Sequence, residues 1–132
     1  MSPDRIGVFA YIMVKGKPKV VLVSSRDGDR WVLPKGRPKS RLSNRSLARL
    51  EAWEEAGIKG HFTGTRSMDV KLRQRGEDMN LRVYPYEVSK VARHWPEKID
   101  RKRKIVSIKK AQKLVGRGGL RQAIRTLGHS LF

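Results

Sequence analysis

The segment from Gly36 to Ile58 constrains this chain most, because it places three carboxylates within one helical turn. Glu51, Glu54 and Glu55 are three and four residues apart, so on a helix they share one face. The whole sequence has 12 acidic residues against 31 Lys and Arg, so this clustering is not what an evenly basic surface produces. Like charges this close resist ionisation unless cations compensate them. We therefore expect a cation beside this helix face.

Two kinds of cation can balance these carboxylates. Mg²⁺ takes hard oxygen ligands and usually keeps waters and substrate phosphates in its octahedral shell. The simpler alternative is a solvated helix face on which Arg45 and Arg49 pair with the glutamates, as ordinary surface ion pairs do. The residues on either side of the carboxylates favour the metal.

Those neighbouring residues predict a helix over residues 43–56 that follows a glycine loop. Ser43 is a suitable N-cap and Gly57 a suitable C-cap. Residues 31–36 form a short apolar stretch that Pro and Gly interrupt. The carboxylate face is flanked by an apolar stripe and a small-residue stripe, namely Leu47, Leu50 and Trp53, and Ala48, Ala52 and Ala56. We expect the backbone carbonyl of Gly36 to join the carboxylates around the metal.

The segment resembles the signature of the Nudix hydrolases, which reads Gly, five residues, Glu, seven residues, Arg-Glu-apolar-x-Glu-Glu-x-Gly-apolar. The positions in register over 23 residues are Gly36, Glu51, Ala52, Glu54, Glu55, Gly57 and Ile58. Two positions differ, because Leu42 replaces the first Glu and Leu50 replaces the Arg. Losing one of two opposite buried charges strands the other, whereas replacing both is nearly neutral. We interpret the two leucines as a joint exchange for packing.

The resemblance implies an α+β fold, the Nudix-type αβα sandwich, in which helices flank a mixed β-sheet. The residue patterns agree with this fold. They predict strands at 5–14 and 19–24 with a turn at 15–18, strand-like stretches at 58–71 and 80–89, a short strand at 105–107, and helices at Ile108–Val115 and Gly119–Leu127. Because the chain has 132 residues and no Gly/Ser/Pro-rich linker, we expect residues 1–132 to form a single domain.

The resemblance also implies a hydrolase of phosphoanhydride bonds with Mg²⁺ or Mn²⁺ as cofactor. A water activated by the metal is expected to attack a phosphorus, with Glu51 or Glu55 as general base. The expected metal ligands are Gly36, Glu51, Glu54 and Glu55.

The segment SSRDGDRWVLPKGR is most similar to the branch that cleaves diphosphoinositol polyphosphates and diadenosine polyphosphates. The expected substrate is therefore a phosphorylated small molecule. Inositol pyrophosphates, dinucleoside polyphosphates, ADP-ribose and nucleotide sugars all remain open, because selectivity within one fold depends on its loops.

Basic residues gather around the glycine loop and again over residues 98–110. Lys35 and Arg37 flank the expected metal loop, so we predict that they contact substrate phosphates. Arg5 and Arg26 are added because the resemblance places them where related proteins face phosphates. A net charge of +19 concentrates polyanions near the surface.

The same charge supports two other hypotheses. The first is a catalytically weakened Nudix-like module that binds polyphosphate or RNA. It is motivated by the replacement of the signature Glu by Leu42 and of the signature Arg by Leu50. The second, ranked lower, is an RNA-processing pyrophosphohydrolase that acts on 5′-triphosphate ends. Nonspecific nucleic-acid binding through the basic surface is compatible with each hypothesis.

Composition excludes several other classes. The chain has no Cys, so it forms no disulfide and no thiolate site. Its three His lack the spacing of a zinc site. No stretch approaches the roughly 18 apolar residues of a membrane span, and the N-terminus lacks the features of a signal peptide. We expect a cytoplasmic protein with no membrane partner.

Overall fold

A mixed β-sheet forms the centre of the fold in the computed structural model, which describes residues 2–132. Its strands are β1 (Arg5–Val14), β2 (Lys17–Ser24), β3 (Trp31–Val32), β4 (Lys35–Gly36), β5 (Ile58–Phe62), β6 (Met68–Gln74), β7 (Glu77–Val91) and β8 (Arg103–Ser107). The helices are α1 (Asn44–Ala56), α2 (Ile108–Val115) and α3 (Gly119–Leu131). The structure confirms the predicted α+β class with a mixed sheet.

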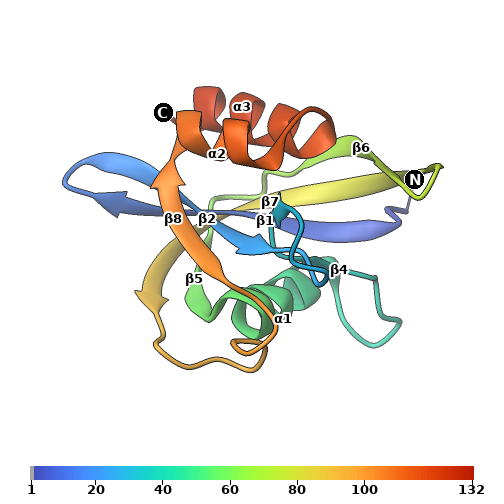
Figure 1. The fold of residues 1–132 in the computed structure, drawn as a ribbon, viewed down its shortest axis with the longest axis horizontal. Coiled ribbons are helices and arrows are strands. Elements are labelled where there is room, and N and C mark those ends of the chain that lie inside the picture. Colours follow the sequence, from blue (N-terminus) through green and yellow to red (C-terminus); the bar gives the residue numbers. More distant parts are fainter. Residues whose placement is uncertain (1) are drawn as a thin grey trace.

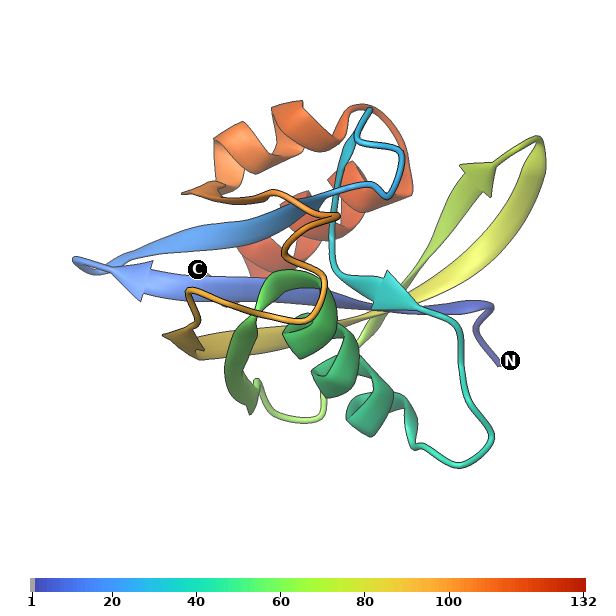
Figure 2. The same ribbon diagram turned by 60° about the horizontal axis from the view of Figure 1, so that its bottom comes forward.

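Strand β1 is the central strand of the sheet. It runs parallel to β7 and antiparallel to β2 and β4. Strands β3 and β8 pair with β2, whereas β5 and β6 pair with different parts of the long strand β7. The hairpin of β6 and β7 projects beyond the body of the sheet (Figure 2).

The sheet is apolar on both faces, because helices cover both of them (Figure 1). Along β1, Val8 and Ala10 point into the core beneath α1, whereas Phe9 and Tyr11 point into the core beneath α2 and α3. Alternate residues of one strand thus fill two separate cores. No helix in residues 2–132 combines the length and the apolar character that a membrane crossing requires.

Helix α1 ends at Ala56 as predicted and begins at Asn44, one residue later than predicted, with Ser43 and Gly57 as the predicted caps. The hydroxyl of Ser43 accepts a hydrogen bond from the backbone N–H of Ser46, and this bond caps the N-terminus. Gly57 ends the helix in the left-handed conformation, with φ 65° and ψ 37°. The buried apolar side of α1 faces the sheet and leaves the glutamates beside β4.

The predicted turn at residues 15–18 is too long. Lys15 and Gly16 have φ values of 52° and 79°, and two consecutive residues of this kind reverse the chain by themselves. Strand β2 therefore begins at Lys17 and includes Pro18, which faces Met13 of β1.

Other predicted limits also need correction. The strand-like stretch at 58–71 divides into β5 and β6, because the chain at Thr63 meets Pro85, which has no N–H to continue the ladder. Strand β7 extends the prediction at 80–89, β8 begins two residues earlier than predicted, and the short apolar stretch at 31–36 becomes β3 and β4. Helix α2 matches its prediction, whereas α3 continues to Leu131.

We predict that Gly57→Ala destabilises the protein by about 1–3 kcal/mol more than Gly64→Ala does, as overpacking typically costs. Both glycines have similar positive φ values, 65° and 62°, so the backbone strain of an added Cβ is matched. At Gly57 this Cβ would lie 2.8 Å from Trp95, whereas at Gly64 it would meet nothing within 4 Å. Urea unfolding of both variants measures the difference, and equal losses would contradict the contact with Trp95.

Candidate active site

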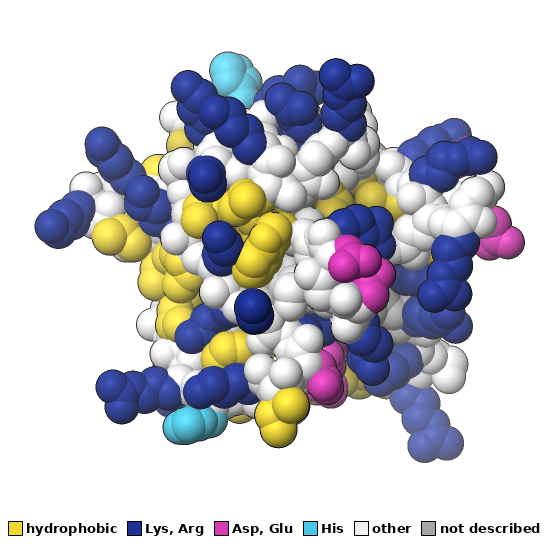
Figure 3. Space-filling view, viewed as in Figure 1, with side chains coloured by type: hydrophobic (Ala, Val, Ile, Leu, Met, Phe, Trp, Pro, Cys, Tyr) yellow, Lys and Arg dark blue, Asp and Glu magenta, His cyan; other side chains and the backbone are white. Residues whose placement is uncertain are grey.

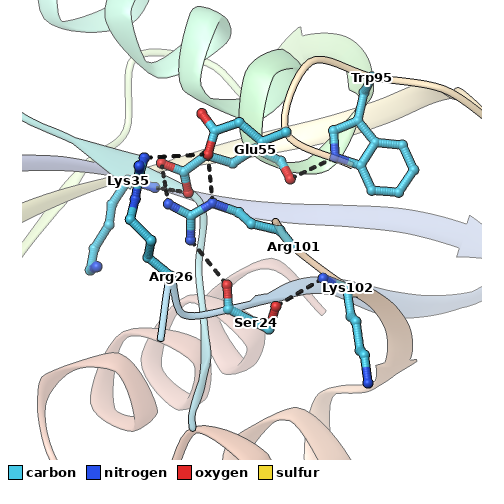
Figure 4. A network of polar contacts seen from close by, with 8 residues as sticks. Ser24, Arg26, Lys35, Glu55, Trp95, Arg101 and Lys102 are labelled. Carbon is cyan, nitrogen blue, oxygen red and sulfur yellow. Dashed lines mark hydrogen bonds and ion pairs between the residues drawn. The ribbon is translucent and has the colours of Figure 1, made fainter. Parts of the chain in front are cut away.

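The carboxylate of Glu55 lies where helix α1, strand β4 and the segment after β7 meet (Figure 4). Glu55 is only 4% exposed. Its Oε1 accepts a hydrogen bond from the backbone N–H of Lys35 at 3.3 Å. Its Oε2 lies 3.7 Å from Nη2 of Arg101. A buried carboxylate of the signature helix is thus held by the glycine loop from one side and by a cation from another.

Arg101 joins this carboxylate to the end of strand β2. Its Nε lies 2.8 Å from Oε1 of Glu97, and its Nη1 donates a hydrogen bond to the carbonyl of Ser24 at 3.0 Å. The guanidinium is almost fully buried, so its polar groups are used within the protein. Arg101 therefore positions Glu55 from a segment that is 46 residues further along the chain.

The segment between β7 and β8, residues 92–102, packs against the C-terminal end of α1. The indole N–H of Trp95 donates to the carbonyl of Glu55 at 3.0 Å. The backbone N–H of Glu97 donates to the carbonyl of Glu54 at the same distance. These two bonds satisfy carbonyls of the last helical turn, which have no partner within a helix. The segment thereby fixes the turn that carries two of the signature glutamates.

Gly36 contacts the third signature glutamate. A Cβ placed on Gly36 would lie 2.5 Å from Oε1 of Glu51, a distance that real Cβ atoms do not show. A side chain at this position would push the Glu51 carboxyl away, so glycine lets the backbone of β4 approach the carboxyl where it lies. The structure brings Gly36 and Glu51 together, as the sequence predicts.

The carboxyls of Glu51 and Glu55 both resist ionisation. Burial, followed by a hydrogen bond with Glu51, raises the pKa of Glu55 to about 8. Burial also raises the pKa of Glu51, and the nearby charges of Glu54 and Glu97 raise it further. Raised pKa values on two neighbouring carboxyls favour one proton on the pair at pH 7.

This pair of carboxylates and the backbone beside it fit a hard divalent cation. Carboxylate and carbonyl oxygens are the donors that Mg²⁺ takes, and a cation relieves the same repulsion that the proton relieves. Residues 2–132 contain no group of three or more His, Asp or Glu side chains arranged for a metal. Glu54 therefore lies close enough to act on the pKa of Glu51, but it does not complete a set of three carboxylates.

A large cleft opens beside the carboxylate pair, with a volume of about 1020 Å³. We call it the basic cleft, and its lining residues are Arg5, Ser25, Arg26, Asp27, Asp29, Arg30, Lys35, Arg37, Arg73, Gln74, Arg75, Glu77, Met79 and Arg101. Lys35 and Arg101 line this cleft and also contact Glu55, so the buried carboxylate lies behind its wall. Many Lys and Arg side chains also lie on the face of the molecule that Figure 3 shows.

The four residues that the sequence predicts as phosphate contacts all line the basic cleft, namely Arg5, Arg26, Lys35 and Arg37. Arg26 also lies 3.7 Å from Glu97. Arg5 and Lys35 are half-buried, whereas Arg26 and Arg37 are exposed. Burial lowers the pKa of Lys35, whereas the charge of Glu55 acts in the opposite direction. The structure thus gathers these four residues from three separate parts of the chain around one space.

Sequence reasoning missed other residues of this site. Arg30, Arg73 and Arg75 line the cleft, although Arg30 was not singled out within the segment SSRDGDRWVLPKGR and the two hairpin arginines lie outside it. Glu97 and Arg101 are four residues apart, which is the spacing of an ion pair on a helix, but here they lie in an irregular segment. The four-residue spacing is the sequence signal that could have predicted the ion pair between Glu97 and Arg101.

The two departures from the Nudix signature lie on the α1 side of the sheet. Leu42 is partly buried and packs against the core beneath α1. Leu50 is half-buried on α1 itself. For Leu42 this environment agrees with an exchange for packing, because an apolar side chain here adds contacts to the core.

Solved structures share this fold over nearly the whole chain. A C. elegans Ap4A hydrolase has 16% sequence identity, covers 100% of both chains and gives a TM-score of 0.79. The Nudix domain of Shewanella oneidensis NrtR, solved with ADP ribose, has 14% identity, covers 97% of this chain and 87% of that chain, and gives 0.77. RenU, a Nudix hydrolase from M. Smegmatis, has 16% identity, covers 97% and 85%, and gives 0.70.

Comparison of the amino-acid sequence alone finds no relatives. No family model matches the chain, and no curated protein matches it either. The likeness that the comparisons show therefore lies in the path of the backbone. Because these structures share their architecture with this chain, the chain has the fold of the Nudix hydrolases.

Proposed function

We propose that this protein is a divalent-metal-dependent hydrolase that cleaves a phosphoanhydride bond in a phosphorylated small molecule. The main support is the position of the Glu51 and Glu55 carboxyls, which lie beside the glycine loop and behind the wall of the basic cleft. Structures with the same fold include an Ap4A hydrolase and a dihydroneopterin triphosphate pyrophosphohydrolase from E. coli. Both of those names describe bonds between phosphates.

The proposed cofactor is Mg²⁺, with Mn²⁺ as an alternative, held by Glu51, Glu55 and the backbone of Gly36. Glu54, on the same helical turn, is the fourth proposed ligand, and its side chain would have to turn toward the pair, because no three acidic side chains in residues 2–132 are arranged for a metal. When bound, such a cation polarises phosphoryl oxygens and lowers the pKa of a coordinated water.

The side chains of the site supply the remaining chemistry. Glu51 or Glu55 takes the proton of the attacking water. Lys35 and Arg37 hold the phosphates and balance the charge that develops on the leaving group. Arg101 keeps Glu55 in place, because its other bonds tie it to Glu97 and Ser24. Arg5 and Arg26 orient the rest of the substrate along the cleft.

A module that only binds polyphosphate or RNA remains the second candidate. It is favoured by the lack of a group of three carboxylates arranged for a metal in residues 2–132. It predicts salt-dependent retention of RNA with no product release when Mg²⁺ is added. The hydrolase predicts turnover of a small molecule under the same conditions.

We predict that Mg²⁺ or Mn²⁺ supports hydrolysis of at least one of four substrates: an inositol pyrophosphate, diadenosine tetraphosphate, ADP-ribose or a nucleotide sugar. Glu51→Gln and Glu55→Gln should each lower turnover by about a hundredfold or more, because each removes a charge that general-base or metal chemistry needs. Glu87→Gln is the control, since Glu87 is exposed on β7 and does not line the cleft.

Product masses identify the bond that is cut, and thermal melts confirm that each variant is folded. Full turnover by folded Glu55→Gln would reject its role. No hydrolysis of any of the four substrates would favour the binding module.

We predict that the stability of the metal-free protein falls as pH rises from about 4.5 to about 8. The Glu55 carboxyl has a higher pKa in the folded protein than the ordinary value of 4.5, so the folded state binds more protons in this range. The protonated Glu55 carboxyl contributes its full stabilisation below the ordinary pKa, and this stabilisation is lost as the pH rises past the raised pKa of the folded state.

Glu55→Gln carries no titrating proton, so its melting temperature should exceed that of the parent at about pH 9 but not at about pH 5. Mg²⁺ should raise the melting temperature of the parent more at the higher pH, because it binds the ionised pair. Glu87→Gln should follow the parent at both pH values. An identical pH profile for parent and Glu55→Gln would contradict the proton between the two carboxyls.

A further inference from the structure

The basic cleft extends from the carboxylate pair to the hairpin of β6 and β7. Lys35 and Arg101 form its wall near Glu55, whereas Arg73, Gln74 and Arg75 form a wall at the hairpin. The hairpin projects beyond the body of the sheet, so it adds a surface that the rest of the fold does not provide (Figure 2). The cleft is at the upper end of the range of about 300–1,000 Å³ for ligand pockets, so it has room for more than a pyrophosphate.

The two arginines of the hairpin are available to a ligand. Arg73 pairs with Asp78 at 3.0 Å, but both side chains are mostly exposed, and exposed pairs of this kind contribute little. No ion pair joins Arg75 to an acidic side chain within residues 2–132. Arg75 and Gly76 have φ values of 51° and 80°, so they form a two-residue turn that holds Arg75 at the tip.

The lining of the cleft lacks the side chains that bind a base. Among its residues none is aromatic, and Met79 is the one large apolar side chain. A purine base held in a protein normally stacks on an aromatic ring. Guanidinium groups instead bind phosphate, often through two parallel hydrogen bonds.

Three carboxylates of the cleft lower its positive charge only in part. Asp27 accepts hydrogen bonds from the hydroxyl of Ser25 and the backbone N–H of Asp29, so it is used in holding its own loop. Asp29 and Glu77 are exposed. Against these three stand eight basic residues of the lining, so a ligand with several phosphates balances the cleft better than one with a single phosphate pair.

We propose that Arg73 and Arg75 form a second phosphate-binding site, which holds the end of the substrate farthest from the cleaved bond. That end carries phosphate groups rather than a base, so the substrate class is a small molecule with phosphates at both ends, either a polyol polyphosphate or a linear polyphosphate. The cleavage of the substrate rests on the proposed function, whereas phosphate binding at the hairpin does not.

The test measures binding by calorimetry without divalent ions and at physiological ionic strength. The probes are inositol hexakisphosphate, linear tripolyphosphate and ADP-ribose. Arg75→Asn removes the charge at the hairpin, and Asn tolerates the positive φ of this position. The matched control is Lys15→Asn, because Lys15 and Gly16 form the same kind of turn, with φ values of 52° and 79°, outside the cleft.

Arg75→Asn should weaken binding of inositol hexakisphosphate by about tenfold, the effect of losing a hydrogen bond to a charged group. Lys15→Asn and the parent should bind it equally, and ADP-ribose should bind Arg75→Asn as it binds the parent. A loss for tripolyphosphate shows that a linear chain reaches the hairpin, and a loss for the inositol compound alone identifies the polyol class. Thermal melts check that both variants are folded.

Two results would overturn the hairpin site. Equal weakening by Arg75→Asn and Lys15→Asn would show that only the overall charge acts, and unchanged binding to Arg75→Asn would show that the hairpin makes no contact. Turnover measured separately keeps the two proposals apart. Weaker binding by Arg75→Asn in a protein without hydrolytic activity would support the hairpin site and reject the hydrolase, and the reverse result would do the opposite.

Discussion

The burial of the Glu55 carboxyl is the constraint on which the rest of this site depends. A carboxylate that is 4% exposed is costly unless a proton, a cation or hydrogen bonds compensate it. The backbone of Lys35 and the guanidinium of Arg101 supply part of that compensation. These contacts bring β4, α1 and the segment before β8 to one point. Burial still raises the pKa of Glu55 to about 8, so these contacts compensate its charge only in part.

The basic cleft carries an excess of positive charge, whereas Glu55 is a buried acidic group. Eight basic side chains face one space, and like charges repel unless solvent or a ligand separates them. Arg101 belongs to both environments, because it lines the cleft and pairs with Glu55 and Glu97. A polyphosphate ligand would therefore neutralise the positive charge of the cleft, and a divalent cation would neutralise the negative charge of the neighbouring carboxylates. This pairing of a carboxylate site with an arginine-rich cleft is the physical basis of the proposed hydrolysis.

Much of the fold was predictable, because local chemistry controls it. The limits of α1 follow from Ser43 and Gly57, whose side-chain cap and left-handed conformation need no distant partner. Strand limits were less predictable, because they depend on the partner strand. The break between β5 and β6 lies opposite Pro85, which is 22 residues from Thr63 in sequence. Hairpin length likewise depended on the paired positive φ values at Lys15 and Gly16.

The sequence by itself determined that the glutamates of α1 share a face, because helical spacing is a local property. Only the tertiary structure decided which carboxylates meet. Glu55 turns into the interior beside Glu51, whereas Glu54 completes no group of three acidic side chains in the described part of the chain. It also decided that Arg101 and the arginines of the β6–β7 hairpin reach this site, since strand pairing brings together residues that no local spacing connects.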